Sequence, residues 1–305
     1  MKQYLDTVKH IMENGNDRND RTGTGTRGVF GYQTRYDLKD SFPLITHRRA
    51  PWKGIVGELV WFLSGSVNNN ELNELNCKFW DKFADDEGSI GPMYGAAWRG
   101  NKPYSVDQMA VILKQLHDDP WSRRIVLDSW SPDYIPSGDV APSENPKNGK
   151  MSLAPCHPVS QYYVENDELS ILFYMRSNDF LLGAPANISS YALLTLILAK
   201  LSGYKAKELV YTAGDAHIYK NHIDSGAVDK ILAAPTFDLP TVDLSDLFNE
   251  EAKQIQSFTK DTPVSEYSRI LDELFITRKH DTYAKLVDSL KNYKCGKSIE
   301  MAISV

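Results

Sequence analysis

The chain has 305 residues, of which 42% are hydrophobic and 24% are charged, and its formal net charge is −6. This composition is typical of a globular protein and excludes a mainly disordered, collagen-like or coiled-coil chain. The acidic balance also argues against a broad nucleic-acid platform, and three cysteines are too few for a disulfide framework, so we expect a cytoplasmic protein (in the host cytoplasm if it is viral).

The N-terminal half of the chain alternates between helix and strand signals. Apolar residues at helical spacing predict helices over residues 4–12 and 52–63. Residues 19–26 predict a polar loop with two glycines, and residues 28–36 alternate as a strand does. Residues 124–130 indicate a buried strand.

The C-terminal half begins with the clearest loop in the sequence. Residues 136–150 hold three prolines and two glycines, which predicts a surface insertion.

The mixture of strands and long helices predicts an α+β fold with one catalytic domain over residues 1–305. The most apolar run is too short to cross a membrane, and the N-terminus lacks a signal-peptide pattern. The later elements expected are strands at 159–164 and 169–175 around a turn, a buried helix at 190–202, a short strand at 209–212 and helices beyond 240.

Cys156 is the candidate nucleophile because Pro155 and Pro158 fix the backbone around it. A lone cysteine is more often buried and inert, whereas a reactive thiolate needs a positive charge nearby. His157 is adjacent, but neighbouring residues on a strand point to opposite faces, so adjacency alone predicts no Cys–His pair. The spacing of histidines and cysteines contains no metal-binding pattern.

Several charged side chains stand in places that call for a partner. Arg176 ends an apolar strand, where it either forms a salt bridge or binds an anion such as phosphate. Glu58 shares a helix face with apolar residues, so it has a partner, has a raised pKa or reaches solvent. A raised pKa would suit general acid–base chemistry.

Eight segments together resemble the thymidylate synthase family, in family order from the N-terminus to about residue 222. The segments are 20–26 (DRTGTGT), 58–63 (ELVWFL), 91–95 (GPMYG), 122–124 (SRR), 154–157 (APCH), 176–179 (RSND), 187–191 (NISSY) and 214–219 (GDAHIY).

A further alternative is a non-catalytic regulator that binds RNA. The presence of Cys156, Arg176 and Asn187 together argues against this alternative.

This resemblance implies a mixed sheet packed by long helices, a homodimer formed through the sheet, and two small-molecule substrates. The substrates would be dUMP and the co-substrate 5,10-methylenetetrahydrofolate, and no membrane, nucleic acid or metal would take part. The implied roles are chemistry at the ring for Cys156, Glu58, Tyr94, His157 and Asn187; nucleotide binding for Arg21, Arg176, Ser177, Asn187, His217 and Tyr219, with Arg123 and Arg124 from the partner subunit; and folate binding for Trp80, Asp179 and Val305.

The departures from the family pattern gather around the pyrimidine. Met175, Asn178 and Ala186 replace residues usual in synthases; Ala186 would open volume and Asn178 would add donors and an acceptor, and such a pocket can hold a water. We therefore expect water to quench the exocyclic methylene intermediate, which gives 5-hydroxymethyl-dUMP and a phage-type dUMP hydroxymethylase. The alternative is a thymidylate synthase, in which hydride from the folate gives dTMP. Asn187 suits the uracil edge and favours dUMP over dCMP.

Overall fold

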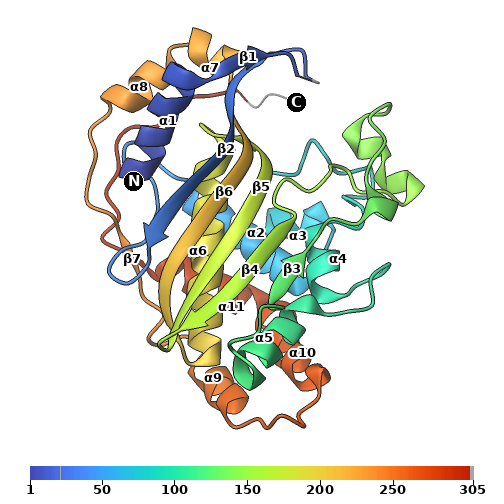
Figure 1. The fold of residues 1–305 in the computed structure, drawn as a ribbon. Coiled ribbons are helices and arrows are strands. Elements are labelled where there is room, and N and C mark those ends of the chain that lie inside the picture. The colour runs from blue at the N-terminus through green and yellow to red at the C-terminus, as the bar shows by residue number, and fades with distance from the viewer. Residues whose placement is uncertain (21, 303–305) are drawn as a thin grey trace.

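The computed structural model describes residues 1–20 and 22–302, in which a six-stranded sheet stands against a layer of helices (Figure 1). The strand order is β1-β2-β6-β5-β4-β3, and every neighbouring pair is antiparallel except β5 and β6, which are parallel. This mixed sheet confirms the predicted α+β class. The strands are β1 (Asn16–Arg18), β2 (Thr26–Asp37), β3 (Val126–Asp128), β4 (Val159–Glu165), β5 (Glu168–Asp179), β6 (Lys205–Tyr219) and a separate pair of β7 (Thr241–Val242) and β8 (Leu290–Lys291).

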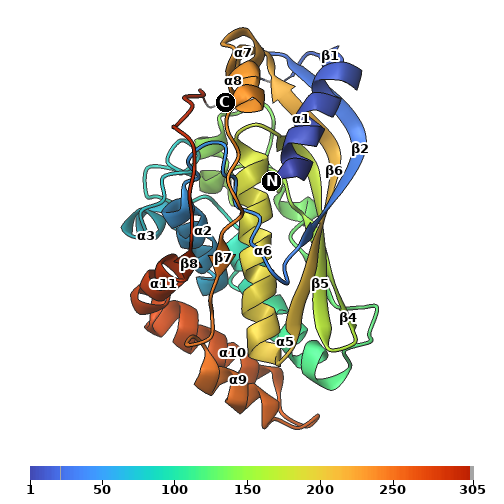
Figure 2. The same ribbon diagram turned by 90° about the vertical axis from the view of Figure 1, so that its left-hand side faces the viewer.

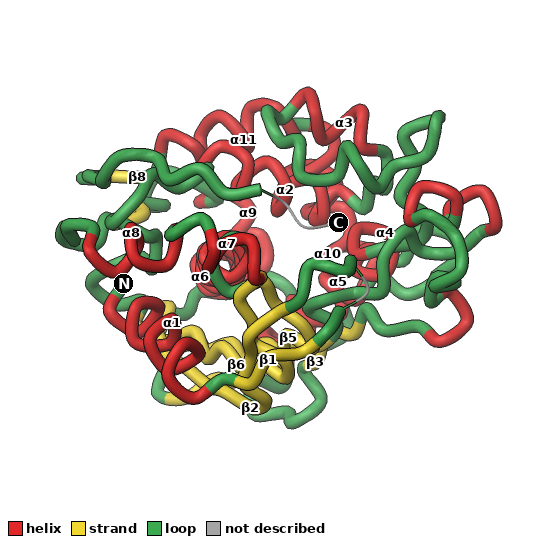
Figure 3. Tube along the Cα trace, turned by 90° about the horizontal axis from the view of Figure 1, so that it is seen from above, coloured by secondary structure: helices red, strands yellow, loops and turns green. Residues whose placement is uncertain are grey.

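The long helices lie on one side of the sheet, as the side view shows (Figure 2). Seen from above, α6 lies between the strands and the outer helices (Figure 3). A π-helical turn, Glu273–Thr277, joins α10 to α11. The helices are α1 (Lys2–Asn14), α2 (Trp52–Ser64), α3 (Asn69–Glu74), α4 (Tyr94–Arg99), α5 (Gln108–Asp118), α6 (Gly183–Ser202), α7 (Lys220–Asp224), α8 (Ala227–Ala233), α9 (Asn249–Gln256), α10 (Val264–Asp272) and α11 (Lys279–Asp288).

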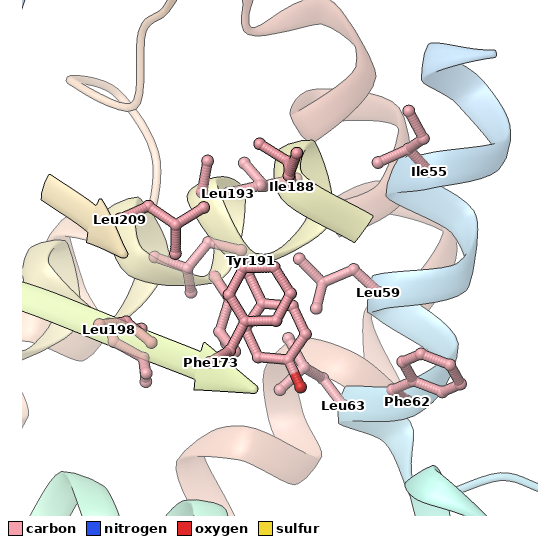
Figure 4. Packing of buried hydrophobic residues seen from close by; sticks show 14 of the residues in the cluster. Ile55, Leu59, Phe62, Leu63, Phe173, Ile188, Tyr191, Leu193, Leu198 and Leu209 are labelled. Carbon is pink, nitrogen blue, oxygen red and sulfur yellow. The ribbon is translucent and has the colours of Figure 1, made fainter. Parts of the chain in front are cut away.

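Helix α6 is the centre of the core because it is apolar on nearly every face. It is the crossover between parallel strands β5 and β6, and it packs on both of them and on α2. The ring of Tyr191 stacks on Phe173 of β5 at 4.1 Å, with Leu59 and Leu63 of α2 facing them (Figure 4). Each such side chain stabilises the fold by roughly 1.5–3 kcal/mol when fully buried. The helix is apolar enough in composition to cross a membrane, but 78% of that stretch is buried inside the protein, as expected of a core helix.

Most of the elements expected from the sequence are present. Helices α1 and α2 and strand β2 are each one or two residues longer at their ends than predicted. The β4–β5 hairpin turns at Asn166 and Asp167, whose φ angles of 52° and 58° match a two-residue turn. Residues 136–150 form an irregular and mostly exposed loop with two short 3₁₀ turns, which confirms the predicted surface loop.

Two strand predictions were wrong in extent. The segment 124–130 forms only the three-residue strand β3, which is an edge strand rather than a buried one, and its Val126 is 38% exposed. The short strand predicted at 209–212 is part of β6, which has 15 residues. Polar residues such as Asp215 and His217 interrupt the apolar alternation of β6, and for that reason its length was missed.

Candidate active site

The thiol of Cys156 lies on the loop that leads into β4. Pro155 and Pro158 restrict the backbone on either side of it. The Cys156 carbonyl accepts a hydrogen bond from the Arg176 N–H at 2.8 Å, and the Cys156 N–H donates to the Tyr94 hydroxyl at 2.7 Å. Contacts to two other elements therefore fix the position of the sulfur.

The guanidinium of Arg176 sets the charge around this thiol. Its Nη2 is 4.0 Å from Cys156 Sγ and donates a hydrogen bond to the Ala154 carbonyl at 2.7 Å. Its Nε donates to the Pro155 carbonyl at 2.8 Å. Its outer side lies over the ring of Trp130 at 5.7 Å. Burial raises the pKa of Cys156, and the positive charge of Arg176 opposes that rise. Arg176 thus stabilises the thiolate, which is the nucleophilic form of cysteine.

Glu58 is a buried carboxyl on α2. Burial raises its pKa to about 7, and a hydrogen bond donated by Trp80 Nε1 to Oε1 at 2.7 Å opposes the rise. Trp80, expected to face the folate, therefore has its N–H committed to Glu58. A carboxyl whose pKa lies near neutrality can both give and take a proton at physiological pH, as a general acid–base group must.

Tyr94 and His157 stack face to face beneath the thiol loop. Their ring centroids are 3.9 Å apart with an interplanar angle of 2°. His157 Nδ1 lies 3.0 Å from the hydroxyl of Tyr191, and burial lowers the pKa of His157 to about 3, so the imidazole is neutral. A neutral imidazole carries one N–H, and the bond between Nδ1 and the Tyr191 hydroxyl fixes the orientation of the ring. We call Glu58, Trp80, Tyr94, His157 and Tyr191 the buried wall.

Polar residues gather where the parallel strands β5 and β6 end side by side. Asp179 pairs with His217 across the two strands, and Ser177 pairs with Asp215. His217 Nδ1 is 2.9 Å from Asp215 Oδ1, and the ring of Tyr219 lies 5.2 Å from that of His217. Four of the predicted nucleotide and folate ligands are thus placed at one edge of the sheet.

Asn187 lies in the first turns of α6, half-buried, near the amide of Asn178. A Cβ placed on Gly183 would lie 3.2 Å from Asn178 Oδ1 and 3.6 Å from Asn187 Oδ1, so the two amides flank this glycine. Asn178 Nδ2 donates to the Tyr211 hydroxyl at 3.2 Å. Met175 is 2% exposed and packs in the core.

Arg123 and Arg124 lie far from the thiol of their own chain. Both are exposed, and they precede the edge strand β3. In the antiparallel β3–β4 pair, Asp128 lies opposite Val159. Cys156 precedes Val159, whereas Arg124 precedes Val126, which lies opposite Gln161, so the thiol and the arginines are at opposite ends of the β3–β4 pair.

Two predicted site residues, Arg21 and Val305, lie outside the described residues. Beside Arg21, the carboxylate of Asp20 accepts hydrogen bonds from the N–H groups of Thr22 at 3.0 Å and Gly25 at 2.6 Å. These bonds close the glycine-bearing loop on itself, as an aspartate-centred turn does.

The arrangement suits covalent attack on an electron-poor ring. It brings together a thiol beside a fixed cation, a carboxyl that titrates near pH 7, and a neutral imidazole of fixed orientation. The polar edge of β5 and β6 adds donors for an anionic, hydroxylated ligand. Such a site can add a nucleophile, move protons at the ring and hold the ligand by its charged end.

Three functional contacts could not be found from the sequence. Tyr191 and Asp215 contact the two predicted histidines His157 and His217, and each belongs to a segment of the family resemblance without a predicted role of its own. The third is the bond of His222 to Ala302, for which the sequence contains no signal. The resemblance quoted Tyr191 within NISSY, so that motif was the available signal.

Comparison with known proteins identifies the group to which these features belong. The family model described as thymidylate synthase matches residues 2–272. A thymidylate synthase of Francisella tularensis subsp. holarctica (strain FTNF002-00 / FTA) is 44% identical over 242 residues, which cover 79% of this chain and 88% of that protein. A thymidylate synthase of Francisella philomiragia subsp. philomiragia is 42% identical over the same shares.

Proposed function

The chain belongs to the thymidylate synthase family, and from that premise we propose that it is a thymidylate synthase, which methylates dUMP to dTMP with 5,10-methylenetetrahydrofolate. One-carbon transfer to dUMP is the activity of the family, and its co-substrate is methylenetetrahydrofolate. The observation that carries the proposal is the thiol of Cys156, held by backbone bonds beside Arg176 and above the buried wall. We take residues 1–305 as one catalytic domain that acts in the cytoplasm.

The first step is addition of the Cys156 thiolate to C6 of the uracil ring. The sulfur–carbon bond forms as the C5–C6 double bond opens, and the negative charge passes to C5 and O4. Arg176 favours the thiolate, and the ring is held at its amide edge by Asn187 on α6. The enolate carbon C5 then attacks the methylene carbon of the folate, which a pyrimidine cannot do without the thiolate adduct.

The buried wall serves the proton movements that follow. Loss of the C5 proton and elimination of tetrahydrofolate leave an exocyclic methylene. Glu58, with a pKa of about 7, suits proton exchange at the O4 side, and Tyr94 and His157 hold the water and hydroxyl network beside C5. Hydride transfer from tetrahydrofolate to the methylene carbon, with expulsion of the Cys156 thiolate, yields dTMP and dihydrofolate.

The hydroxymethylase expected from the sequence is the second candidate. It is favoured by the side-chain oxygen of Asn178. This oxygen and that of Asn187 both lie beside Gly183, so Asn178 would add a polar atom near the base. Two observations weaken it: Asn178 Nδ2 is occupied by Tyr211, and Met175 packs in the core. The names of the similar proteins also favour the synthase.

We further propose that the site is completed by a second copy of this chain. One face of the sheet is covered by helices (Figure 2), whereas the other leaves large apolar side chains in solvent, among them Tyr163 at 62%, Leu172 at 37% and Tyr174 at 36% exposed. A bare apolar sheet face of this kind is suited to a homodimer interface. Because Arg123 and Arg124 are exposed and lie at the end of the β3–β4 pair opposite their own Cys156, they can serve the phosphate of the partner's site.

Product analysis tests the proposal. The purified chain is incubated with dUMP and methylenetetrahydrofolate, and the nucleotide and folate products are separated and identified. The proposal expects dTMP and dihydrofolate in equal amounts. Formation of 5-hydroxymethyl-dUMP with tetrahydrofolate would instead establish the hydroxymethylase, and a chain that changes neither substrate would remove both candidates.

A further inference from the structure

His222 on α7 is a buried histidine that the proposed chemistry does not use. It is 1% exposed, and its Nε2 lies 2.7 Å from the carbonyl oxygen of Ala302 in the C-terminal segment. A carbonyl oxygen only accepts hydrogen bonds, so Nε2 carries the hydrogen and donates it. This bond ties the last described residue of the chain to the end of the active-site strands, because α7 directly follows β6.

The other ring nitrogen of His222 faces the predicted folate ligand. His222 Nδ1 is 4.0 Å from Asp179 Oδ1, and within residues 1–20 and 22–302 it has no hydrogen-bond partner. Asp179 Oδ1 already accepts from the N–H groups of Leu181 and Leu182 at 3.1 Å each, which hold the carboxylate at the start of α6. Burial raises the pKa of Asp179, and the charges of His222 and His217 oppose that rise.

The C-terminal segment reaches His222 along a path without regular secondary structure. After β8, the Gly296 N–H donates to the Thr46 carbonyl at 2.9 Å, and the chain then runs to Ala302. A hollow of about 340 Å³ is lined by Glu300, Met301 and Ala302 on one side and by residues of α7, His222 among them, on the other. The bond from His222 to Ala302 joins the two sides of this hollow.

We infer that His222 is a positioning residue that fastens the C-terminal segment to α7 through Nε2 and, with Nδ1 4.0 Å away, forms the polar surroundings of the Asp179 carboxylate. The inference rests on the proposed function, since Asp179 is expected to meet the folate. It goes beyond that function by assigning one side chain to join the folate carboxylate and the C-terminal segment. Loss of His222 should then weaken the use of folate and leave nucleotide binding intact.

Three substitutions separate the two contacts of the imidazole. In His222→Gln the amide nitrogen reaches the place of Nε2 and can still donate to Ala302. In His222→Asn the shorter amide lies near the place of Nδ1 and can serve only Asp179. His222→Phe keeps a ring of similar shape and makes neither contact. Ser225→Ala is the matched control, because Ser225 lines the same hollow and its hydroxyl donates only to the His222 carbonyl at 3.2 Å.

Steady-state kinetics with both substrates give the first readout. His222→Phe is expected to raise the KM for methylenetetrahydrofolate about tenfold, which corresponds to the loss of the buried hydrogen bond to Ala302, with the KM for dUMP within about twofold of the native value. His222→Gln and His222→Asn should each recover part of the loss, and the control should match the native chain. Equal rises in both KM values, or no rise in the folate KM of His222→Phe, would overturn the inference.

Hydrogen–deuterium exchange of the ligand-free protein gives a readout that needs no activity. Exchange of residues 297–302 should quicken in His222→Phe and His222→Asn and stay near native in His222→Gln, because only glutamine keeps the donor to Ala302. Equal exchange in the glutamine and asparagine variants would overturn the inference, even if the phenylalanine variant failed to fold. A native chain without one-carbon transfer would end the proposed function, and this exchange result would still stand or fall by itself.

Discussion

The buried wall and the arginine pair on β3 differ in how complete one chain leaves them. In the wall, Glu58 is hydrogen-bonded to Trp80, and His157 is hydrogen-bonded to Tyr191 and stacked on Tyr94. All of these residues belong to one chain and lie in its core. Arg123 and Arg124 are exposed and far from their own thiol. The difference teaches that one chain preorganises the buried wall by itself, whereas its exposed arginine pair is left free for the role across a dimer interface that we propose.

Removal of the nucleophile should have the largest effect. Cys156→Ala is expected to lower kcat by at least ~10⁴-fold, because addition at C6 has no substitute, while dUMP binding measured by calorimetry stays close to native. Cys295→Ala, at a half-buried cysteine away from the site, is the matched control and should keep native activity. Turnover by Cys156→Ala near the native rate would refute the covalent mechanism.

Removal of the buried carboxyl should come next. Glu58→Gln keeps the shape of the side chain and loses its proton exchange, so kcat should fall by ~10²–10⁴-fold. The limb near pH 7 in the kcat/KM profile of the native chain should disappear in this variant, since Glu58 has a pKa of about 7. Glu165→Gln, at an exposed carboxyl, should leave both the rate and the profile unchanged.

The raised pKa of Glu58 also has a consequence for stability. The folded chain holds this proton more tightly than the unfolded chain, whose glutamate titrates near 4.5. The stabilisation is full below pH 4.5 and is lost as pH rises through 7, at a cost of about 3 kcal/mol in the free energy of unfolding. Urea unfolding at pH 5 and pH 8 should show this difference shrinking in Glu58→Gln; an unchanged difference would mean that Glu58 titrates normally.

Mixed dimers test whether the arginine pair acts across an interface. Arg124→Ala and Cys156→Ala homodimers should each be nearly inactive, whereas their heterodimer has one complete site. Random mixing at equal concentration should therefore restore about a quarter of the native specific activity, since half of the dimers are mixed and each has one working site of two. If activity does not return although subunit exchange is verified by mass spectrometry, the arginines act within their own chain.

The smallest effect should come from the edge of the buried wall. Tyr191→Phe keeps the stacking on Phe173 and removes only the hydrogen bond to His157 Nδ1. We expect kcat to fall about fivefold, equivalent to ~1 kcal/mol for one hydrogen bond, with melting temperature lowered by a few degrees. A native kcat would show that the orientation of His157 does not depend on Tyr191.

The sequence predicted the fold best where periodicity and burial agree. Helices α1 and α2 and the β4–β5 hairpin follow from apolar spacing and turn residues. Strand β3 was predicted too long and fully buried because the sequence does not show that it lies at the edge of the sheet, where Leu127 is buried and Val126 is exposed. Strand β6 was predicted too short because functional polar residues break its alternation.

The site was predicted less from spacing than from resemblance. Spacing pointed to Cys156 and raised Glu58 and Arg176 as open questions, and the resemblance supplied the remaining roles. The pairs that set their chemistry, such as Trp80 with Glu58, join residues that are distant in sequence. No periodicity encodes such contacts, so they required the folded structure.

The fate of the folate hydride tests the central claim most directly. Methylenetetrahydrofolate carrying deuterium at the carbon that donates hydride is given to the native chain with dUMP, and both products are analysed by mass spectrometry. A thymidylate synthase moves the deuterium into the methyl group of dTMP and leaves dihydrofolate without it. Deuterium retained in tetrahydrofolate, beside an unlabelled 5-hydroxymethyl nucleotide, would contradict the account.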